Sequence, residues 1–192
     1  MANIQLNNNH IKGICQCGIA GDISLLSTLE GIPNELKVLK QWGLWALVSK
    51  EGKKPNKRLI SPDLRRPISP MPKDYKHLAV FDVALETLRK RYQRKALING
   101  EEWVVSGLGF VLTADDPFVI VDVDDCIVEG QLSAEALEVI DHFNAPTEVS
   151  YSGNGIHIIC KGSLPNPACR KGNFEIYEKE RFFALTGRFI HE

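Results

Sequence analysis

Two aspartates follow an apolar run in the second half of the sequence. The run Phe118-Val119-Ile120-Val121 has the composition of a β-strand and leads directly into Asp122 and Asp124. Because side chains alternate faces along a strand, both carboxylates point the same way, with Cα atoms about 6.6 Å apart. Two carboxylates so placed repel each other unless a cation lies between them, and hard divalent ions prefer oxygen ligands. The pattern predicts a divalent-metal site, from which alternation excludes Asp125.

A histidine and a glutamate interrupt two later apolar strands in the same manner. His157 and Glu175 each lie between two apolar neighbours, so each faces away from them. A sheet with both side chains on the aspartate face would hold three carboxylates and one imidazole together. Taken singly, the histidine also fits a hydrogen-bonded structural role, and the glutamate fits a solvent-facing position. An EF-hand is a poor match, because Cys126 and Ile127 stand where that loop needs an oxygen ligand and a glycine.

A glycine-rich turn precedes His157. The turn Ser152-Gly153-Asn154-Gly155 is followed by a strand instead of a helix, so it is neither a P-loop nor a dinucleotide fingerprint. It fits a simple hairpin connection, since Asn-Gly favours tight reversal. It also fits a phosphate cradle, because successive backbone N–H groups in such a turn bind oxyanions.

The elements expected to position these residues form a mixed pattern. The expected helices cover residues 34–40, 78–95 and 133–143, and the expected strands cover 44–48, 108–112, 118–124, 156–161, 174–177 and 182–186. Residues 49–73 carry five prolines and eight basic residues, which favours an irregular loop. The order predicts an α+β fold with a largely antiparallel sheet.

The 192-residue length fits one main domain, which we place at residues 31–192 after a poorly specified extension at 1–30. No apolar run approaches the roughly 20 residues needed to cross a bilayer, and the first residues are not a signal peptide. We therefore expect a soluble, cytoplasmic protein without a membrane partner. The five cysteines are odd in number and scattered, which fits reduced thiols. Cys15 and Cys17 could form half of a zinc site, but no second close pair follows.

The net charge of −1 conceals a strong asymmetry. Residues 50–95 hold 14 of the 23 Lys and Arg residues against five acids. This basic block fits either a solvated surface or a surface that attracts polyanions. Trp45 alternates with Leu44 and Leu47, which favours a core position over base stacking.

Three motifs occur in a defined order. They are Asp122-Val123-Asp124, then Ser152-Gly153-Asn154-Gly155-Ile156-His157, then Phe174-Glu175-Ile176-Tyr177 with Arg181-Phe182-Phe183 and Thr186-Gly187 downstream. This order resembles the archaeo-eukaryotic primase superfamily, and most nearly the prim-pol (bifunctional DNA primase/polymerase) domains of phage and plasmid replication proteins. Upstream, Gln41-Trp42-Gly43-Leu44-Trp45 is similar to the start of those domains. The resemblance covers roughly residues 32–189.

The resemblance implies an RRM-like antiparallel sheet with flanking helices and an N-terminal α/β unit. It implies template-directed nucleotidyl transfer with two Mg²⁺ or Mn²⁺ ions, which fits the mechanism of two-metal sites. The implied roles are metal binding and catalysis by Asp122, Asp124 and Glu175, nucleotide binding by Ser152, Gly153, Gly155, His157 and Arg181, and DNA or phosphate binding by Lys54, Lys57, Arg65 and Arg66. The implied partners are a DNA template and primer, nucleoside triphosphates, and a helicase in cis or in trans.

Two other functions remain open from the sequence. One is a replication-initiator module that binds nucleotide and DNA without synthesis, and the other is a metal-dependent nuclease. A triphosphate cradle at Ser152 to His157 favours a transferase over a nuclease. Prim-pol relatives commonly continue into helical and helicase segments, whereas this sequence stops at His191-Glu192, so we expect either a fragment or a minimal stand-alone protein.

Overall fold

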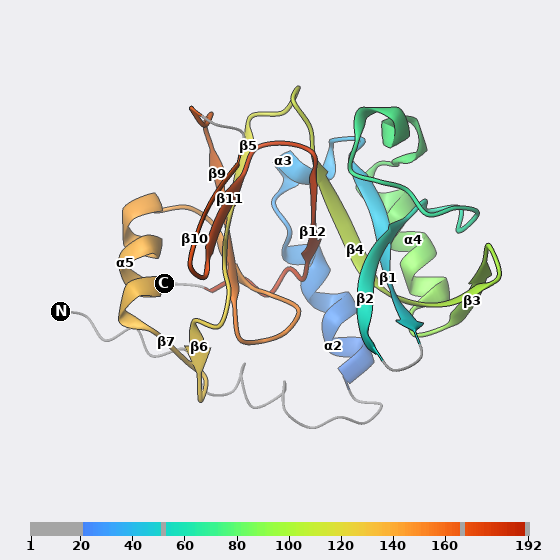
Figure 1. Cartoon of the computed structure of the whole chain (residues 1–192), viewed down its shortest axis with the longest axis horizontal. Helices are drawn as coiled ribbons and strands as arrows, with labels where there is room; N and C mark the ends of the chain where they lie inside the picture. Colours follow the sequence, from blue (N-terminus) through green and yellow to red (C-terminus); the bar gives the residue numbers. More distant parts are fainter. Residues whose placement is uncertain (1–20, 51–52, 166–167, 191–192) are drawn as a thin grey trace. The chain divides into compact units, whose positions relative to one another are not determined.

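The computed structural model describes residues 21–50, 53–165 and 168–190. These residues form an α+β fold built from antiparallel sheets, which confirms the predicted class (Figure 1). Two units are distinguished. Unit 1 comprises the described residues of 1–31, 117–178 and 186–192, and unit 2 comprises those of 32–116 and 179–185. The boundary expected at residues 30–31 as the start of a single catalytic domain stays a prediction.

Unit 2 is a five-stranded antiparallel sheet with the order β12-β4-β1-β2, in which β3 also pairs with β4. Its strands are β1 (Trp42–Lys50), β2 (Lys53–Ile60), β3 (Lys95–Ile98), β4 (Glu101–Leu112) and β12 (Arg181–Leu185). The helix α4 (Phe81–Arg91) lies behind β1 and β4 in Figure 1. The short helices α3 (Asn34–Lys37) and η2 (Pro72–His77) complete the unit.

Aromatic side chains fill the core of unit 2. Trp42 is fully buried, with its ring centroid 5.1 Å from that of Phe81 and 5.0 Å from that of Phe110. Trp45 is 1% exposed, which confirms the predicted core position and removes it as a base-stacking platform. Its indole ring packs over Gly107, where an added Cβ would approach the ring nitrogen to 2.5 Å.

The sequence prediction differs from the structure in several places in this unit: α3 is shorter than expected, β4 begins at Glu101 and β3 was not predicted. Two further errors have a clear physical reason. The expected irregular loop at 49–73 contains β2, because β2 lies at the sheet edge, where Pro55 removes no essential ladder bond. The register of the β1–β2 pair also shifts between Val48 and Lys50. The helix expected to reach residue 95 ends at Arg91, because Gln93 has φ +56° and donates its backbone N–H to Val105. The chain then enters β3.

Unit 1 is a second antiparallel sheet with the order β10-β11-β5-β9-β8. Its strands are β5 (Phe118–Val123), β8 (Thr147–Val149), β9 (Ile156–Lys161), β10 (Ala168–Lys171) and β11 (Phe174–Tyr177). A small separate hairpin joins β6 (Ile127–Val128) and β7 (Gln131–Leu132). Residues 186–190 run beside β8, where the Val149 N–H donates to Arg188 and the Ile190 N–H donates to Thr147.

One face of the unit 1 sheet is apolar and is covered by α5 (Ala134–Phe143), as Figure 1 shows. The helix begins at Ala134, one residue after the predicted start, and Ser133 is its N-cap, whose hydroxyl accepts the Ala136 N–H at 3.2 Å. Its buried stripe packs on a cluster formed by Val119, Val121, Val123, Ile156 and Ile158. The apolar face is thereby filled, which leaves the opposite face of β5 and β9 for polar residues.

A further helix, α2 (Gly21–Thr28), precedes the 3₁₀ turn η1 (Leu29–Gly31). The Thr28 hydroxyl donates to the Thr186 carbonyl at 2.8 Å, so this helix belongs to unit 1. Cys15 and Cys17 lie outside the described residues. In the described part of the chain, no helix has the length and apolarity needed to span a membrane.

Candidate nucleotidyl-transfer site

A row of polar side chains crosses the unit 1 sheet. The register places Arg170 opposite Glu175, Glu175 opposite Asp122, Asp122 opposite His157, and His157 opposite Glu148. Residues directly opposite each other in antiparallel strands share one face of the sheet. We call these five residues the polar row, and the predicted residues Asp122, His157 and Glu175 form its centre.

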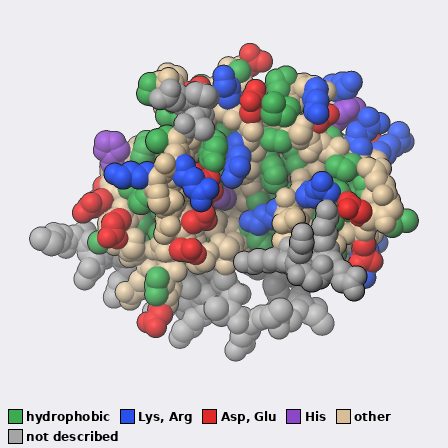
Figure 2. Space-filling view, viewed as in Figure 1, with side chains coloured by type: hydrophobic (Ala, Val, Ile, Leu, Met, Phe, Trp, Pro, Cys, Tyr) green, Lys and Arg blue, Asp and Glu red, His purple; other side chains and the backbone are tan. Residues whose placement is uncertain are grey.

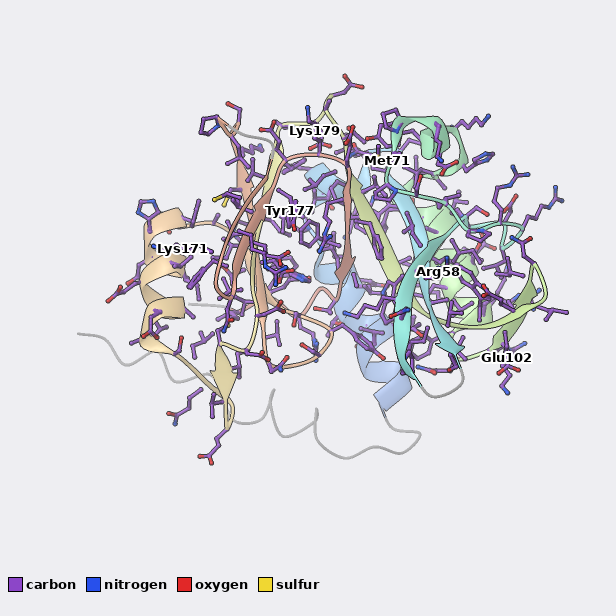
Figure 3. The ribbon with its side chains drawn as sticks, in the orientation of Figure 1. Arg58, Met71, Glu102, Lys171, Tyr177 and Lys179 are labelled. Carbon is purple, nitrogen blue, oxygen red and sulfur yellow. The ribbon has the colours of Figure 1, made fainter. Side chains whose placement is uncertain are left out.

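Two carboxylates are adjacent at the centre of the polar row. Asp122 and Glu175 occupy directly opposite positions, where like charges destabilise a strand pair. Glu175 is only 7% exposed and already has two partners, the Arg170 guanidinium at 2.9 Å and the Tyr177 hydroxyl at 2.7 Å. Figure 3 shows Tyr177 on β11. Arg170 and Tyr177 therefore stabilise the glutamate charge beside Asp122.

Asp124 and Asp125 follow β5 in a turn. The strand ends at Val123, one residue earlier than expected, so Asp124 is exposed in the turn instead of extending the alternation. Its backbone N–H donates to the Asn173 carbonyl at 2.9 Å, which ties the turn to the β10–β11 hairpin. Asp125 has φ +50° and accepts a 2.6 Å hydrogen bond from the Asn154 side chain. The residue excluded from the metal set thus connects the aspartate turn to the glycine-rich turn.

The glycine-rich turn packs against the end of β5. An added Cβ at Gly155 would approach the Val123 carbonyl oxygen to 2.7 Å, so only glycine allows this approach. The Gly153 N–H donates to the Ser150 carbonyl at 3.1 Å within the turn itself. The Ser152 hydroxyl bonds to the side chains of Ser150 and Asn154. The turn is therefore fixed from within and lies beside the aspartates.

His157 lies between two carboxylates. Its Nδ1 is 2.8 Å from Oε1 of Glu148, and its Nε2 is 3.8 Å from Oδ1 of Asp122. Glu148 was missed in the sequence because β8 has three residues, too few to display alternation. The available signal was a single acidic residue between Thr147 and Val149, two residues with high β-propensity.

The Asp122 and Glu175 carboxylates suit a divalent cation, but the described residues do not form a complete set of metal ligands. The opposed Asp122 and Glu175 carboxylates supply hard oxygen donors whose mutual repulsion a cation would relieve. Among the described residues, no group of three His, Cys, Asp or Glu side chains is arranged as a metal-binding cluster. Each Glu175 oxygen accepts one hydrogen bond, from Arg170 or Tyr177, and keeps a second lone pair that a cation could use.

The remaining predicted site residues belong to unit 2 and are not part of the polar row. Arg181 is exposed at the start of β12. Lys57 places its ammonium 5.6 Å from the Trp45 ring centroid, and Arg65 and Arg66 are exposed after β2. Lys54 lies in β2. Figure 2 shows Lys and Arg side chains on the surface of the segment between β2 and α4, in agreement with a basic block.

Neighbouring contacts hold part of this basic surface in place. Arg58, labelled on β2 in Figure 3, forms a 3.2 Å ion pair with Glu101 and lies 5.4 Å from the Trp103 ring centroid. Asp63 accepts hydrogen bonds from the Ser61 hydroxyl and the Arg65 N–H, which lower the pKa of its carboxyl. The loop that carries Arg65 and Arg66 is therefore structured.

Comparison with known proteins gives one informative match. The chain is 38% identical over 90 residues to a DNA primase-polymerase of Nitratiruptor phage NrS-1. The match covers 43% of this chain and 12% of the phage protein, so the chain spans a small part of that relative's length. No family model matches the sequence. The match supports a relationship to a phage DNA primase-polymerase.

Proposed function

We propose that this chain carries the nucleotidyl-transfer site of a DNA primase-polymerase that acts in replication of a phage, plasmid or other mobile element. The observation that supports this proposal is the polar row, in which Asp122 is flanked by Glu175 and His157 and lies beside the glycine-rich turn. Carboxylates that can hold divalent ions and a polar turn that can bind phosphate oxygens are the parts that nucleotidyl transfer needs. The similarity to the phage primase-polymerase supports the same function.

In the proposed reaction, Asp122, Asp124 and Glu175 would hold two Mg²⁺ or Mn²⁺ ions. When bound, such ions lower the pKa of a primer hydroxyl and neutralise the leaving pyrophosphate. His157 and the Ser152 hydroxyl orient the triphosphate of the incoming nucleotide. Because the His157 ring is nearly buried and bonded to Glu148, it offers a fixed direction of approach to a phosphate oxygen. Lys54, Lys57, Arg65, Arg66 and Arg181 supply cationic contacts to template or nucleotide phosphates.

The test is primer extension and de novo synthesis on single-stranded DNA with Mg²⁺ or Mn²⁺. Wild type is compared with Asp122→Asn/Glu175→Gln and with Asp141→Asn, which removes an exposed carboxylate from α5 as a matched control. We expect loss of synthesis in the double variant and full synthesis in the control. Full activity of the double variant would overturn the proposal.

The same assay separates the alternatives. Nucleotide binding without incorporation by the wild type indicates a replication-initiator module. Degradation of labelled DNA in the absence of nucleotides indicates a metal-dependent nuclease.

A further inference from the structure

Glu148 is a fully buried carboxylate with an unusually complete set of partners. Its side chain is 0% exposed. Oε1 lies 2.8 Å from His157 Nδ1, and Oε2 accepts the backbone N–H groups of Thr186 at 3.0 Å and Gly187 at 2.8 Å. A buried carboxylate is costly unless such donors compensate its lost hydration. Two backbone donors and one imidazole satisfy that requirement here.

The hydrogen bond between Glu148 and His157 determines which ring nitrogen donates to Glu148 and which one faces Asp122. Both Glu148 oxygens accept backbone N–H groups, so the carboxyl acts as an acceptor on each side, and the hydrogen of the bond to His157 lies on Nδ1, which donates it to Oε1. Nε2 is then the ring atom directed toward Asp122, at 3.8 Å. Since the ring is 6% exposed and held at Nδ1, its orientation is set before any ligand arrives.

We propose that Glu148 is a positioning residue for the nucleotide contact of His157. It holds Nδ1 so that Nε2 is directed toward Asp122, and Nε2 would donate to a triphosphate oxygen of the incoming nucleotide when both ring nitrogens carry a hydrogen. This inference rests on the proposed function, because it assigns the His157 contact to a nucleotide. The same carboxylate also fixes Thr186 and Gly187, so the histidine and that segment are held by one group.

The first test observes the ring nitrogens of the ligand-free protein and needs no activity. In a proton–nitrogen correlation spectrum of wild type, we expect a hydrogen on His157 Nδ1 that exchanges slowly with water. In Glu148→Gln, the one amide oxygen accepts the two backbone N–H groups and the NH₂ group faces Nδ1, so this hydrogen should be lost. A wild-type spectrum without a hydrogen on Nδ1 overturns the inference, whether or not the variant folds.

The second test is a double-mutant cycle on nucleotide binding, with dATP and ATP titrated calorimetrically in Mg²⁺ without DNA. We expect His157→Ala and Glu148→Gln each to weaken binding by roughly tenfold, the low end of the effect of losing a hydrogen bond to a charged group. The double variant should bind nucleotide no more weakly than His157→Ala, because both substitutions act on the same contact between His157 and the nucleotide. The inference is overturned if Glu148→Gln weakens nucleotide binding as much in the His157→Ala protein as it does in wild type.

A matched control separates positioning from general stability. Thr186→Val removes the hydroxyl bonds to Val149 and Arg188 in the same corner but leaves the backbone N–H that Glu148 accepts. We expect a lower Tm and unchanged nucleotide affinity, whereas an affinity loss equal to that of Glu148→Gln counts against positioning. If His157→Ala alone leaves affinity unchanged, the nucleotide contact of the proposed function fails, and the nitrogen spectrum then decides the Glu148 contact by itself.

Discussion

Asp122 lies directly opposite Glu175, so the β5–β11 pair brings two carboxylates together on one face of the unit 1 sheet. Arg170 on β10 and Tyr177 on β11 itself bond to Glu175, and His157 lies on the other side of Asp122. The pair is therefore part of a continuous polar row and not an isolated acidic patch. Cation binding by Asp122 and Glu175 can be measured directly.

Mn²⁺ should stabilise the wild type and should not stabilise Asp122→Asn. A ligand that binds only the folded state at 100 times its Kd adds about 2.7 kcal/mol to the free energy of unfolding. Without metal, removal of the Asp122 charge should change the free energy of unfolding by no more than ~1 kcal/mol, because cross-strand side-chain pairs contribute up to about that much. Thermal unfolding in EDTA and in Mn²⁺ measures both effects. Equal Mn²⁺ stabilisation of the variant would show that Asp122 is not a ligand.

Arg170→Gln should strengthen metal binding. The guanidinium competes with a cation for Oε1 of Glu175, but it is largely exposed, so its removal should tighten Mn²⁺ binding only about two- to fivefold. The gain should shrink at high salt, because exposed charges are screened. Lys171→Gln is the control, since alternation places this neighbour on the other face of β10. Equal gains in both variants would indicate a general charge effect.

Gly155→Ala should disrupt the glycine-rich turn. The new Cβ would meet the Val123 carbonyl at 2.7 Å, which is backbone and cannot move aside without shifting β5. We expect a cost of about 1–3 kcal/mol in unfolding free energy, as for other overpacked sites, and weaker nucleotide binding. Gly162→Ala is the control, because an added Cβ there meets nothing within 4 Å. Unchanged affinity and Tm in Gly155→Ala would contradict the packing.

The three described thiols of unit 1, Cys126, Cys160 and Cys169, should react unequally with one another. Burial raises the pKa of Cys126 and of Cys160 to about 11, whereas Cys169 is exposed. At pH 8, a thiol with that pKa is about one-thousandth thiolate, and the thiolate is the reactive form. Iodoacetamide at pH 8 should therefore label Cys169 first, and labelling of the two buried thiols should rise with pH. Peptide mass spectrometry measures the order, and equal rates in native protein would contradict the burial.

Arg65→Ala/Arg66→Ala should weaken binding to single-stranded DNA without regard to its sequence. Each phosphate contact contributes about 0.7 to the slope of log affinity against log salt concentration. Loss of two contacts should lower that slope by about 1.4, measured by fluorescence anisotropy over a salt series. Lys40→Ala, an exposed charge outside residues 50–95, should leave the slope unchanged. An unaltered slope in the double variant would remove both arginines from the DNA-binding surface.

Much of the polar row could be predicted because alternation is a local property of each strand. Asp122, His157 and Glu175 each interrupt apolar residues, so their common orientation follows from period two alone. The pairing that places them side by side depends on long-range register, which local patterns do not contain. Glu148 was missed because the three residues of β8 are too few to display alternation. Arg170 was missed because only the register of β10 and β11 places it opposite Glu175.

The errors in unit 2 have a different origin. The prolines around β2 are strong local signals for a loop, but an edge strand tolerates them because one side of its backbone has no strand to bond. The end of α4 was misplaced because Gln93, which turns the chain, is neither glycine nor proline. A left-handed residue of that type has no distinctive sequence signature.

The chain passes from one unit to the other after residues 31, 116, 178 and 185. Neither unit is therefore an uninterrupted piece of the sequence, and β12 joins the unit 2 sheet from a position far along the chain. A fragment cut after residue 116 would expose the hydrogen-bonding edge of β4 that β12 covers, and bare edges of this kind recruit other strands. A protein made for expression must therefore contain both units, and a circular permutant or an engineered replacement for β12 would be needed to separate them.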